Sequence, residues 1–321
     1  MTLPRRLFLA AAAAAPLPLR AQGARALTLV VPYAAGGGTD ISGREFGIGF
    51  AQALGRTVVV DNRAGAAGHV GAVSVARSRP DGSTLLYAVS TNIVVNPHLQ
   101  RGDRMDLAEA LVPVAQTSSY QYLLVVNPEV PARNLTELLA LIRARPKGEL
   151  TYSSGGVGNA NHLAGVLFSE AARVEMEHVP YRGTAPALLD VVAGRVTMNF
   201  SSPPPAIALI REGKLRPIAV TGDHRIAALP EVPTLAEAGL PGAVITGWHG
   251  VFAPASTPPA LLEGLTSAAQ AAAASPGFAG RLEKEGLEPA PARPLAEFGA
   301  AVKAESAFWA RKIAELGLKL E

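Results

Sequence analysis

The 321-residue sequence contains no cysteine, which excludes disulfide frameworks, cysteine-ligated zinc, iron–sulfur clusters and thiol catalysis. Aromatic residues make up only 5% of the chain, so we expect cores built mainly from Ala, Val and Leu. Apolar residues make up 49% and charged residues 17%, a balance that excludes a wholly disordered protein. At roughly 150 residues per domain, the length predicts about two domains.

The signatures of several enzyme classes are also absent. The chain has no GxxxxGK[ST] phosphate loop, no HExxH, no GxSxG and no SxxK. The six histidines occur singly, without the spacing of metal ligands. The segment Gly65–Gly71 reads GxxGxxG, and no acidic residue follows about 20 positions later, as dinucleotide binding requires. The sequence therefore predicts no cofactor and no metal.

The N-terminus has the pattern of an export signal. Arg5 and Arg6 precede an apolar stretch over residues 7–19, and Ala21 offers a small residue for cleavage. The apolar stretch is shorter than the roughly 20 residues that span a bilayer. We predict a signal peptide over residues 1–21 and a periplasmic protein exported by the Sec or the twin-arginine route.

Net charge gives no support for a nucleic-acid partner. Residues 1–21 hold three of the 29 basic residues and no acidic one, which leaves 26 basic against 26 acidic residues in the mature chain. A nucleic-acid-binding protein needs a concentrated basic surface.

Strand and helix patterns alternate along the rest of the chain. We expect strands at 27–32, 57–60, 83–90, 122–127, 150–153, 178–180, 196–200 and 216–221. Helices are expected at 41–54, 64–77, 161–172, 184–193, 206–211, 257–274, 277–285 and 294–316. Asn134 with Glu137, and Thr234 with Glu237, have the spacing of capping boxes. This order predicts an α/β fold whose sheets are mostly parallel and covered by helices.

Glycine-rich turns between strands and helices are the strongest functional pattern. In 36–40 (GGGTD), glycines would let backbone N–H groups approach a ligand, and the helix N-terminus adds about half a unit of positive charge. The alternative is a tight turn in which Thr39 or Asp40 caps the helix. Similar turns occur at 153–162 and 181–184. Since ligands bind at the carboxyl ends of parallel strands, two such lobes would form a polar cleft without an evident nucleophile or base.

Seven segments, taken in order, resemble the motifs of the Bug-type, or TctC-like, periplasmic substrate-binding proteins of tripartite tricarboxylate transporters. They cover nearly all of the mature chain: VVPYAAGGGTD (30–40), DNRAGAAGHVGA (61–72), PDGSTLL (80–86), LTYSSGGVGNANHLAG (150–165), VPYRGTAPALLD (179–190), EVPTLAEAGLPG (231–242) and GWHGVFAPASTP (247–258). The resemblance implies a two-lobe Venus-flytrap fold, with one lobe formed by 27–123 plus 248–321 and the other by 124–247.

The resemblance also implies the ligand contacts. In the first lobe they would be Tyr33, Gly37, Gly38, Thr39, Asp40, Ser90 and Asn92. In the second lobe they would be Ser154, Gly158, Asn159, His162, Tyr181, Gly183, Thr184 and Asp190. For Asp190, a helix position facing solvent or a neighbouring loop is an equal alternative. Asn159 stands where many relatives have Ser or Thr, and 201–205 matches the family pattern loosely.

The leading hypothesis is therefore an exported, monomeric, non-catalytic receptor for a small organic carboxylate. It would serve the membrane subunits of a tripartite tricarboxylate transporter, or a sensor protein to which it presents the ligand. The alternative is an exported hydrolase or isomerase on a similar fold, with an acid–base or nucleophile pair drawn from Asp40, His162 and Ser154. Dicarboxylates, tricarboxylates, amino acids and aromatic acids all remain open as ligands.

Overall fold

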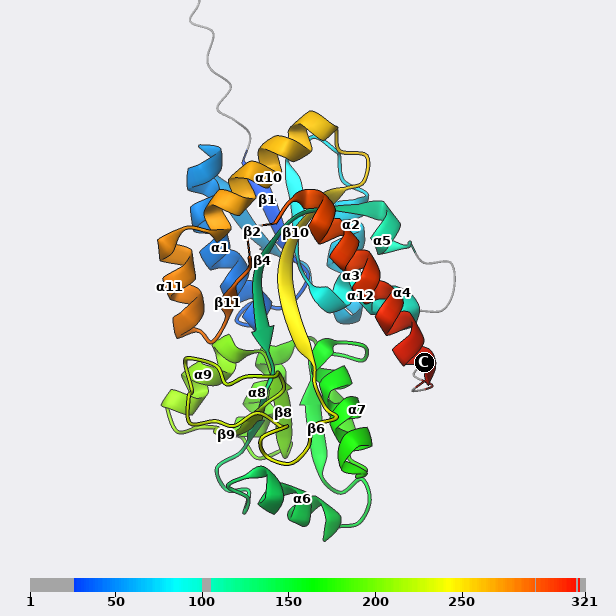
Figure 1. The fold of residues 1–321 in the computed structure, drawn as a ribbon, viewed down its shortest axis with the longest axis vertical. Coiled ribbons are helices and arrows are strands. Elements are labelled where there is room, and N and C mark those ends of the chain that lie inside the picture. Colours follow the sequence, from blue (N-terminus) through cyan, green and yellow to red (C-terminus); the bar gives the residue numbers. More distant parts are fainter. Residues whose placement is uncertain (1–25, 100–104, 292, 316, 318–321) are drawn as a thin grey trace, which may run out of the picture.

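The computed structural model describes residues 26–99, 105–291, 293–315 and 317, and the predicted signal peptide lies outside them. Two sheets with their helices follow one another along the long axis of the molecule (Figure 1). Within the described ranges, no helix is long and apolar enough to cross a membrane.

The six-stranded sheet has the order β11-β4-β10-β3-β1-β2. Its strands are β1 (Leu27–Val31), β2 (Val58–Asn62), β3 (Thr84–Val89), β4 (Leu111–Gln121), β10 (Thr246–Pro254) and β11 (Glu288–Pro289). β1 pairs in parallel with β2 and β3, whereas β10 and β11 run antiparallel to their neighbours.

The five-stranded sheet has the order β7-β6-β8-β5-β9. Its strands are β5 (Leu123–Val126), β6 (Thr151–Ser154), β7 (Glu177–Pro180), β8 (Met198–Ser201) and β9 (Arg216–Val220). β6 is parallel to β7 and β8, and β5 is antiparallel to β8 and β9.

The α/β class is confirmed, but both sheets are mixed rather than mostly parallel. The long strands β4 and β10 do not appear among the predicted strands, because polar residues interrupt their apolar pattern. β4 runs on toward the five-stranded sheet, and β10 begins where the chain returns from that sheet. A strand that enters a sheet this way needs no helical crossover, so it is free to pair antiparallel.

The helices are α1 (Gly38–Leu54), α2 (His69–Ala76), α3 (Ser90–Val94), α4 (Asn96–Leu99), α5 (Leu107–Ala110), α6 (Leu135–Arg143), α7 (Ala160–Ala172), α8 (Thr184–Val192), α9 (Pro203–Arg211), α10 (Pro259–Ala273), α11 (Pro276–Lys284) and α12 (Leu295–Glu315), with a 3₁₀ turn at Ala66–Gly68. Most of them lie close to their predicted positions. The short helices α3, α4 and α5 were not predicted, and the helix expected at 64–77 is formed only as the 3₁₀ turn and α2. Gly55 ends α1 in the left-handed conformation, where its N–H bonds to the last turn of the helix.

The two capping boxes have different outcomes. Asn134 accepts a hydrogen bond from the Glu137 N–H at 2.9 Å and begins α6 as predicted. Thr234 and Glu237 also exchange hydrogen bonds, at 2.8 and 3.0 Å, but residues 235–239 form only a turn. Gly239 adopts a left-handed φ of 96°, and Pro241 follows, so no helix continues.

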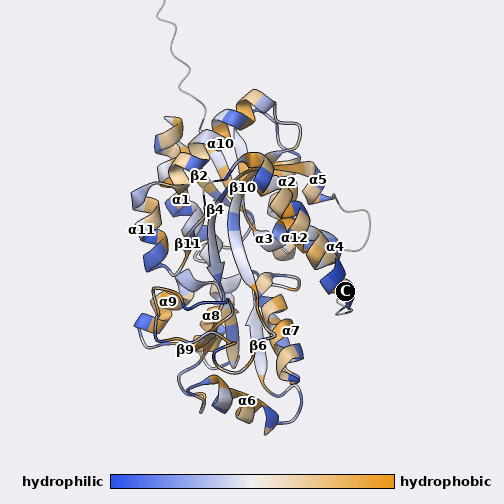
Figure 2. Ribbon diagram, in the orientation of Figure 1, coloured by the Kyte–Doolittle hydropathy of each residue, from blue (hydrophilic) through white to orange (hydrophobic). Residues whose placement is uncertain are grey.

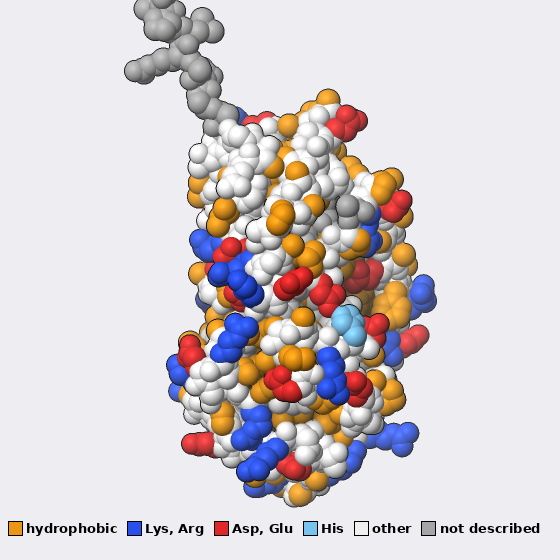
Figure 3. Space-filling model, turned by 60° about the vertical axis from the view of Figure 1, so that its left-hand side comes forward, with side chains coloured by type: hydrophobic (Ala, Val, Ile, Leu, Met, Phe, Trp, Pro, Cys, Tyr) orange, Lys and Arg blue, Asp and Glu red, His pale blue; other side chains and the backbone are white. Residues whose placement is uncertain are grey.

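Helices from the C-terminal part of the chain cover the six-stranded sheet. α10 packs on α1 and β4, and α12 packs on β4 and α3 (Figure 1). These helices carry both hydrophilic and hydrophobic residues (Figure 2), as expected for helices with one buried side. On the face shown in Figure 3, basic side chains are interspersed with acidic ones.

The chain crosses between the sheets at Tyr122 and again between β9 and β10. Thr221 joins these crossings, because its hydroxyl accepts from the Tyr122 N–H at 2.9 Å and donates to the Ile245 carbonyl at 2.6 Å. The Gly222 N–H donates to the Gln121 side chain at 3.0 Å. The crossing segments are therefore fastened to one another by buried hydrogen bonds.

Candidate functional site

A cavity of about 20 Å³ lies between loops that follow strands of the two sheets. It is lined by Tyr33, Gly37, Gly38, Thr39, Val89, Tyr120, Tyr122, Asn159, Asn161, Thr184 and Ser202. None of these side chains carries a charge. Room of this size accommodates about one water molecule, so the structure is closed around the cavity.

The loops of the two sheets touch each other through small residues. A Cβ atom added to Gly38 would lie 2.9 Å from the Cβ of Ser202 and closer still to its Oγ. A Cβ atom on Gly183 would lie 3.4 Å from the Cβ of Ala34. Because such spacing leaves no room for larger side chains, these residues permit the closed arrangement.

Four helices of nine or more residues begin at this cavity. Gly37, Asn159, Gly183 and Ser202 are the N-cap residues of α1, α7, α8 and α9. Only the Asn159 side chain caps its own helix, where its Oδ1 accepts from the Asn161 N–H at 3.2 Å. Each helix N-terminus contributes about half a unit of positive charge. The cavity is therefore electropositive without a cationic side chain.

The helices differ in what they can donate. α9 begins with three prolines, at 203–205, which have no N–H, so this helix contributes its dipole but no donor from these residues. At the start of α1, the Thr39 hydroxyl forms no hydrogen bond with another described residue. The Thr184 hydroxyl, at the start of α8, lies 3.5 Å from the Asn161 Oδ1, a weak contact. Both hydroxyls remain able to donate to a ligand.

Tyr33 lines the cavity and is held by Asn92 from behind. The Asn92 Nδ2 donates to the Tyr33 hydroxyl at 2.7 Å, and the Asn92 Oδ1 accepts from the Val89 N–H at 3.2 Å. Burial raises the pKa of Tyr33 well above its usual value. Asn92 and Ser90 are themselves buried and lie outside the cavity lining. Asn92 therefore supports Tyr33 from behind and does not line the cavity.

Asp40 also lies outside the cavity lining. Its carboxylate accepts from the Gly36 N–H, the Asn62 Nδ2 and the Arg44 Nε, each at 2.9 Å. Burial would raise the pKa of Asp40, but the hydrogen bonds from Arg44, Gly36 and Asn62 outweigh it and lower that pKa. Asp40 thus holds the turn that presents Gly37. This agrees with the tight turn that the capping alternative proposed.

Ser154, Gly158 and His162 brace the second glycine-rich turn. The Ser154 hydroxyl lies 2.6 Å from the His178 Nε2, and the Gly158 N–H donates to the His162 Nδ1 at 3.2 Å. The two imidazole rings lie 4.2 Å apart. Burial lowers the pKa of His162 to about 4 and that of His178 to about 3, so both rings are neutral at pH 7.

The Ser154–His178 contact has the form of a nucleophile and its base, but its setting does not suit catalysis. Ser154 has no exposed surface and does not line the cavity. A histidine with a pKa of about 3 is a weak general base at neutral pH. Asp40, bonded within the other loop, is not assembled with His162 and Ser154 as the hydrolase alternative required.

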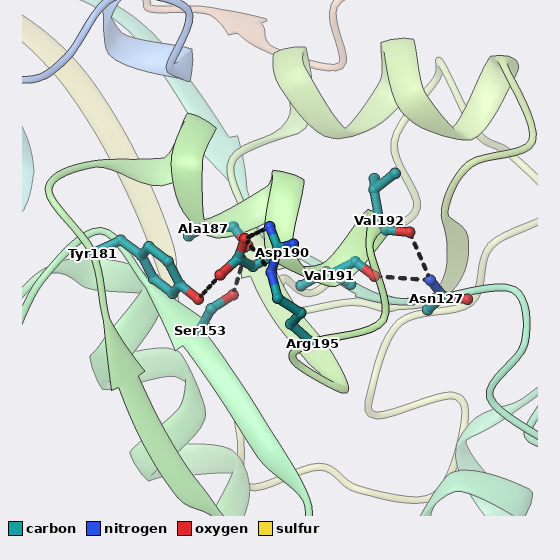
Figure 4. Close-up of polar contacts among 8 residues, drawn as sticks. All are labelled: Asn127, Ser153, Tyr181, Ala187, Asp190, Val191, Val192 and Arg195. Carbon is teal, nitrogen blue, oxygen red and sulfur yellow. Dashed lines mark hydrogen bonds and ion pairs between the residues drawn. The ribbon is translucent and has the colours of Figure 1, made fainter.

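Tyr181, which lies between β7 and α8, forms a separate cluster with Asp190 on α8, drawn in Figure 4. The Tyr181 hydroxyl donates to the Asp190 carboxylate, which also accepts from the Arg195 Nε at 3.0 Å. The hydrogen bond from Arg195, followed by that from Tyr181, lowers the pKa of Asp190. At the same end of α8, the Asn127 amide donates to the carbonyls of Val191 and Val192 in the last turn. Neither Tyr181 nor Asp190 lines the cavity.

Of the expected contacts, the structure thus brings together Tyr33, Gly37, Gly38, Thr39, Asn159 and Thr184, with Gly183 as the adjoining N-cap. The cavity is also lined by residues that were not among the expected contacts, namely Val89, Tyr120, Tyr122, Asn161 and Ser202. Tyr120 and Tyr122 flank the crossing between sheets, and their hydroxyls lie 3.1 Å apart. The sequence pattern that could have identified them is a pair of tyrosines at alternate positions, next to the point where the chain crosses between the sheets.

Metal binding finds no support at this cavity. In the described part of the chain, no group of three or more His, Asp or Glu side chains is placed to hold a metal ion.

Two α/β lobes closed over a small polar cavity define the class of solute-binding receptors. The profile of the tripartite tricarboxylate transporter family receptor, TctC, matches residues 43–318, and the chain belongs to this family. A curated relative from Pseudomonas sp. (strain P51), a UPF0065 protein in the tcbD-tcbE intergenic region, is 38% identical over 92% of this chain and 87% of its own length. The family comprises receptors rather than enzymes.

Solved structures confirm the two-lobe periplasmic-binding-protein fold. The periplasmic binding protein BugD superposes with a TM-score of 0.88 and 30% identity, over 93% of this chain and 99% of its own. Rpa4515 from R. palustris, solved with adipate, has a TM-score of 0.88 and 32% identity over 93% and 99% of the two chains. MatC from Rhodopseudomonas palustris, with bound malate, has a TM-score of 0.84 and 29% identity over 90% and 98%.

Proposed function

We propose that this protein is an exported periplasmic receptor that captures a small organic carboxylate between its two lobes. The observation that carries the proposal is the convergence of the α1, α7, α8 and α9 N-termini on a cavity lined by no charged side chain. An anion bound there is stabilised by backbone dipoles and by hydroxyl donors. Related structures that hold adipate and malate support an acid as the ligand.

The lobes in this proposal are 27–123 plus 248–321 and 124–247. Ligand entry and release require the lobes to separate about the crossings near Tyr122 and Thr221, because the loops that line the cavity touch each other in the closed arrangement. The receptor would act as a monomer and deliver its ligand to the membrane subunits of a tripartite tricarboxylate transporter, or to a sensor. Residues 1–21 would direct export.

Thr39 and Thr184 offer the sharpest test, since their hydroxyls face the cavity from opposite lobes. A thermal-shift screen of mono-, di- and tricarboxylates first selects the acid that most raises the unfolding midpoint. Titration calorimetry then compares Thr39→Ala and Thr184→Ala with the parent protein. We expect each variant to lose about tenfold or more in affinity, since a hydrogen bond to a charged group contributes about 1.5–3 kcal/mol.

Thr266→Ala is the matched control. Its hydroxyl is buried in α10 away from the cavity and has no partner in the described structure. This substitution should leave affinity unchanged. If both cavity variants bind like the parent, the site assignment is wrong, and if no acid shifts the midpoint, the proposed ligand class is wrong.

A further inference from the structure

A second hollow, of about 300 Å³, lies in the lobe of the six-stranded sheet and is lined by residues of α3, α4, α5, β4, β10 and α12. Its wall includes Ile93, Leu111, Phe252 and Val302, each at least 92% buried. It shares no lining residue with the cleft cavity. A volume of this size is that of a small-molecule site.

The hollow is divided into an apolar interior and a polar mouth. Lys303 and His98 are exposed at its rim, and Ser306 is half-buried beside them, with its Oγ 2.8 Å from the His98 Nε2. The Lys303 ammonium has no acidic partner within 4 Å among residues 26–99, 105–291, 293–315 and 317. As far as the described residues go, the site therefore offers hydrophobic contact at depth and, at the opening, one positive charge without an acidic partner.

We propose that this hollow is a second ligand site, which binds an amphiphilic monocarboxylate with its hydrocarbon part inside and its carboxylate at Lys303. Burial of apolar surface supplies the affinity, and each methylene group that enters adds about 0.8 kcal/mol in transfer free energy. Lys303 sets the orientation, because it is the one Lys or Arg side chain among the described lining residues and is exposed at the rim. The cleft differs, because its lining combines helix N-termini with hydroxyl and amide groups and carries no charged side chain.

A chain-length series tests the apolar interior. Butanoate, hexanoate, octanoate and decanoate are titrated into the mature protein by calorimetry. We expect affinity to rise about fourfold for each added methylene until the hollow is filled. A flat series overturns the proposal.

Two helix variants then test the location. Ala307 lines the hollow from α12, and Ala307→Leu should abolish octanoate binding by filling it. Ala304→Leu, on the same helix but outside the lining, should bind octanoate like the parent. Binding that survives Ala307→Leu overturns the proposal, because the fatty acid then lies elsewhere, for example in the cleft.

The charge at the mouth has its own test. Lys303→Gln should weaken octanoate two- to fivefold, the range for an exposed ion pair, and leave neutral octanamide unchanged. Lys284→Gln, on α11 and outside the hollow, should change neither. Equal loss for octanoate and octanamide would show that Lys303 provides no charge recognition, and would overturn the assigned orientation.

Discussion

The Oγ1 atom of Thr221 accepts a hydrogen bond from the N–H of Tyr122 at 2.9 Å, which fastens one crossing between the lobes to the other. Thr221→Val removes this acceptor and leaves a buried N–H without its partner. We expect a loss of about 1–3 kcal/mol in unfolding free energy, measured by urea denaturation. Thr221→Ser keeps the hydroxyl and should lose much less. Equal stability of the Val variant and the parent would contradict this role.

Gly38→Ala should separate ligand binding from folding. The added methyl group would collide with Ser202 only when the lobes are closed, and alanine is otherwise favourable in a helix. We expect affinity for the selected acid to fall more than tenfold while the ligand-free unfolding midpoint stays within a few degrees. X-ray scattering should show a more extended molecule in the presence of ligand.

Two further variants check the cause of that loss. Gly49→Ala, in the same helix, places its methyl group at an ordinary 3.6 Å from Ala272 and should bind like the parent. The double variant Gly38→Ala with Ser202→Gly removes the collision and should recover affinity. Failure of the double variant to recover would show that Gly38 acts through its own backbone rather than through the closing contact.

Acid should destabilise the protein through His249. This ring is fully buried between Tyr87 and Tyr120, and burial lowers its pKa to about 3. Because the folded-state pKa lies below the unfolded value of about 6.5, the unfolded chain binds more protons between them. The stabilisation is complete above pH 6.5 and is lost as the pH falls, by about 2 kcal/mol at pH 5.

Thermal unfolding at pH 7.5 and 5 checks this, with His249→Phe as the variant that keeps an aromatic ring. The phenylalanine variant should lose less stability between the two pH values than the parent. His224 acts in the opposite sense, because the hydrogen bonds that its ring donates to Glu288 and then to Asp223 raise its pKa. His224→Gln should therefore steepen the acid loss, and parallel curves for all three proteins would refute the assignment.

Asp190→Asn should spare ligand binding. The carboxylate pairs with Arg195 and Tyr181 and does not line the cavity (Figure 4). We expect affinity within about twofold of the parent by calorimetry and a small fall in the unfolding midpoint, since exposed ion pairs contribute little. Thr184→Ala, on the same helix but facing the cavity, is the contrasting variant. A large loss of affinity in Asp190→Asn with unchanged stability would place Asp190 in the site.

The loops at Gly37, Asn159 and Gly183 were predictable because their glycine and hydroxyl pattern is local and sits between a strand and a helix. Tyr120 and Tyr122 were not, because they reach the cavity only through pairing between strands that are distant in sequence. Ser202 also lies between a strand and a helix, but prolines rather than glycines follow it, so its segment lacks that pattern. The same limit applies to Asp40, for which the local sequence pattern suggested a ligand contact. Its residue type fits a ligand contact, yet Asn62, 22 positions away, takes part in holding its carboxylate.

In the proposed function, anions are attracted to the cleft by peptide groups at helix starts, and peptide groups have no proton to gain or lose across physiological conditions. Affinity should therefore follow the ionisation of the captured acid alone. In a compartment whose pH follows that of the cell's surroundings, such a receptor would bind ionised acids with the same affinity in neutral and alkaline media. Acids that are only weakly ionised would be bound least.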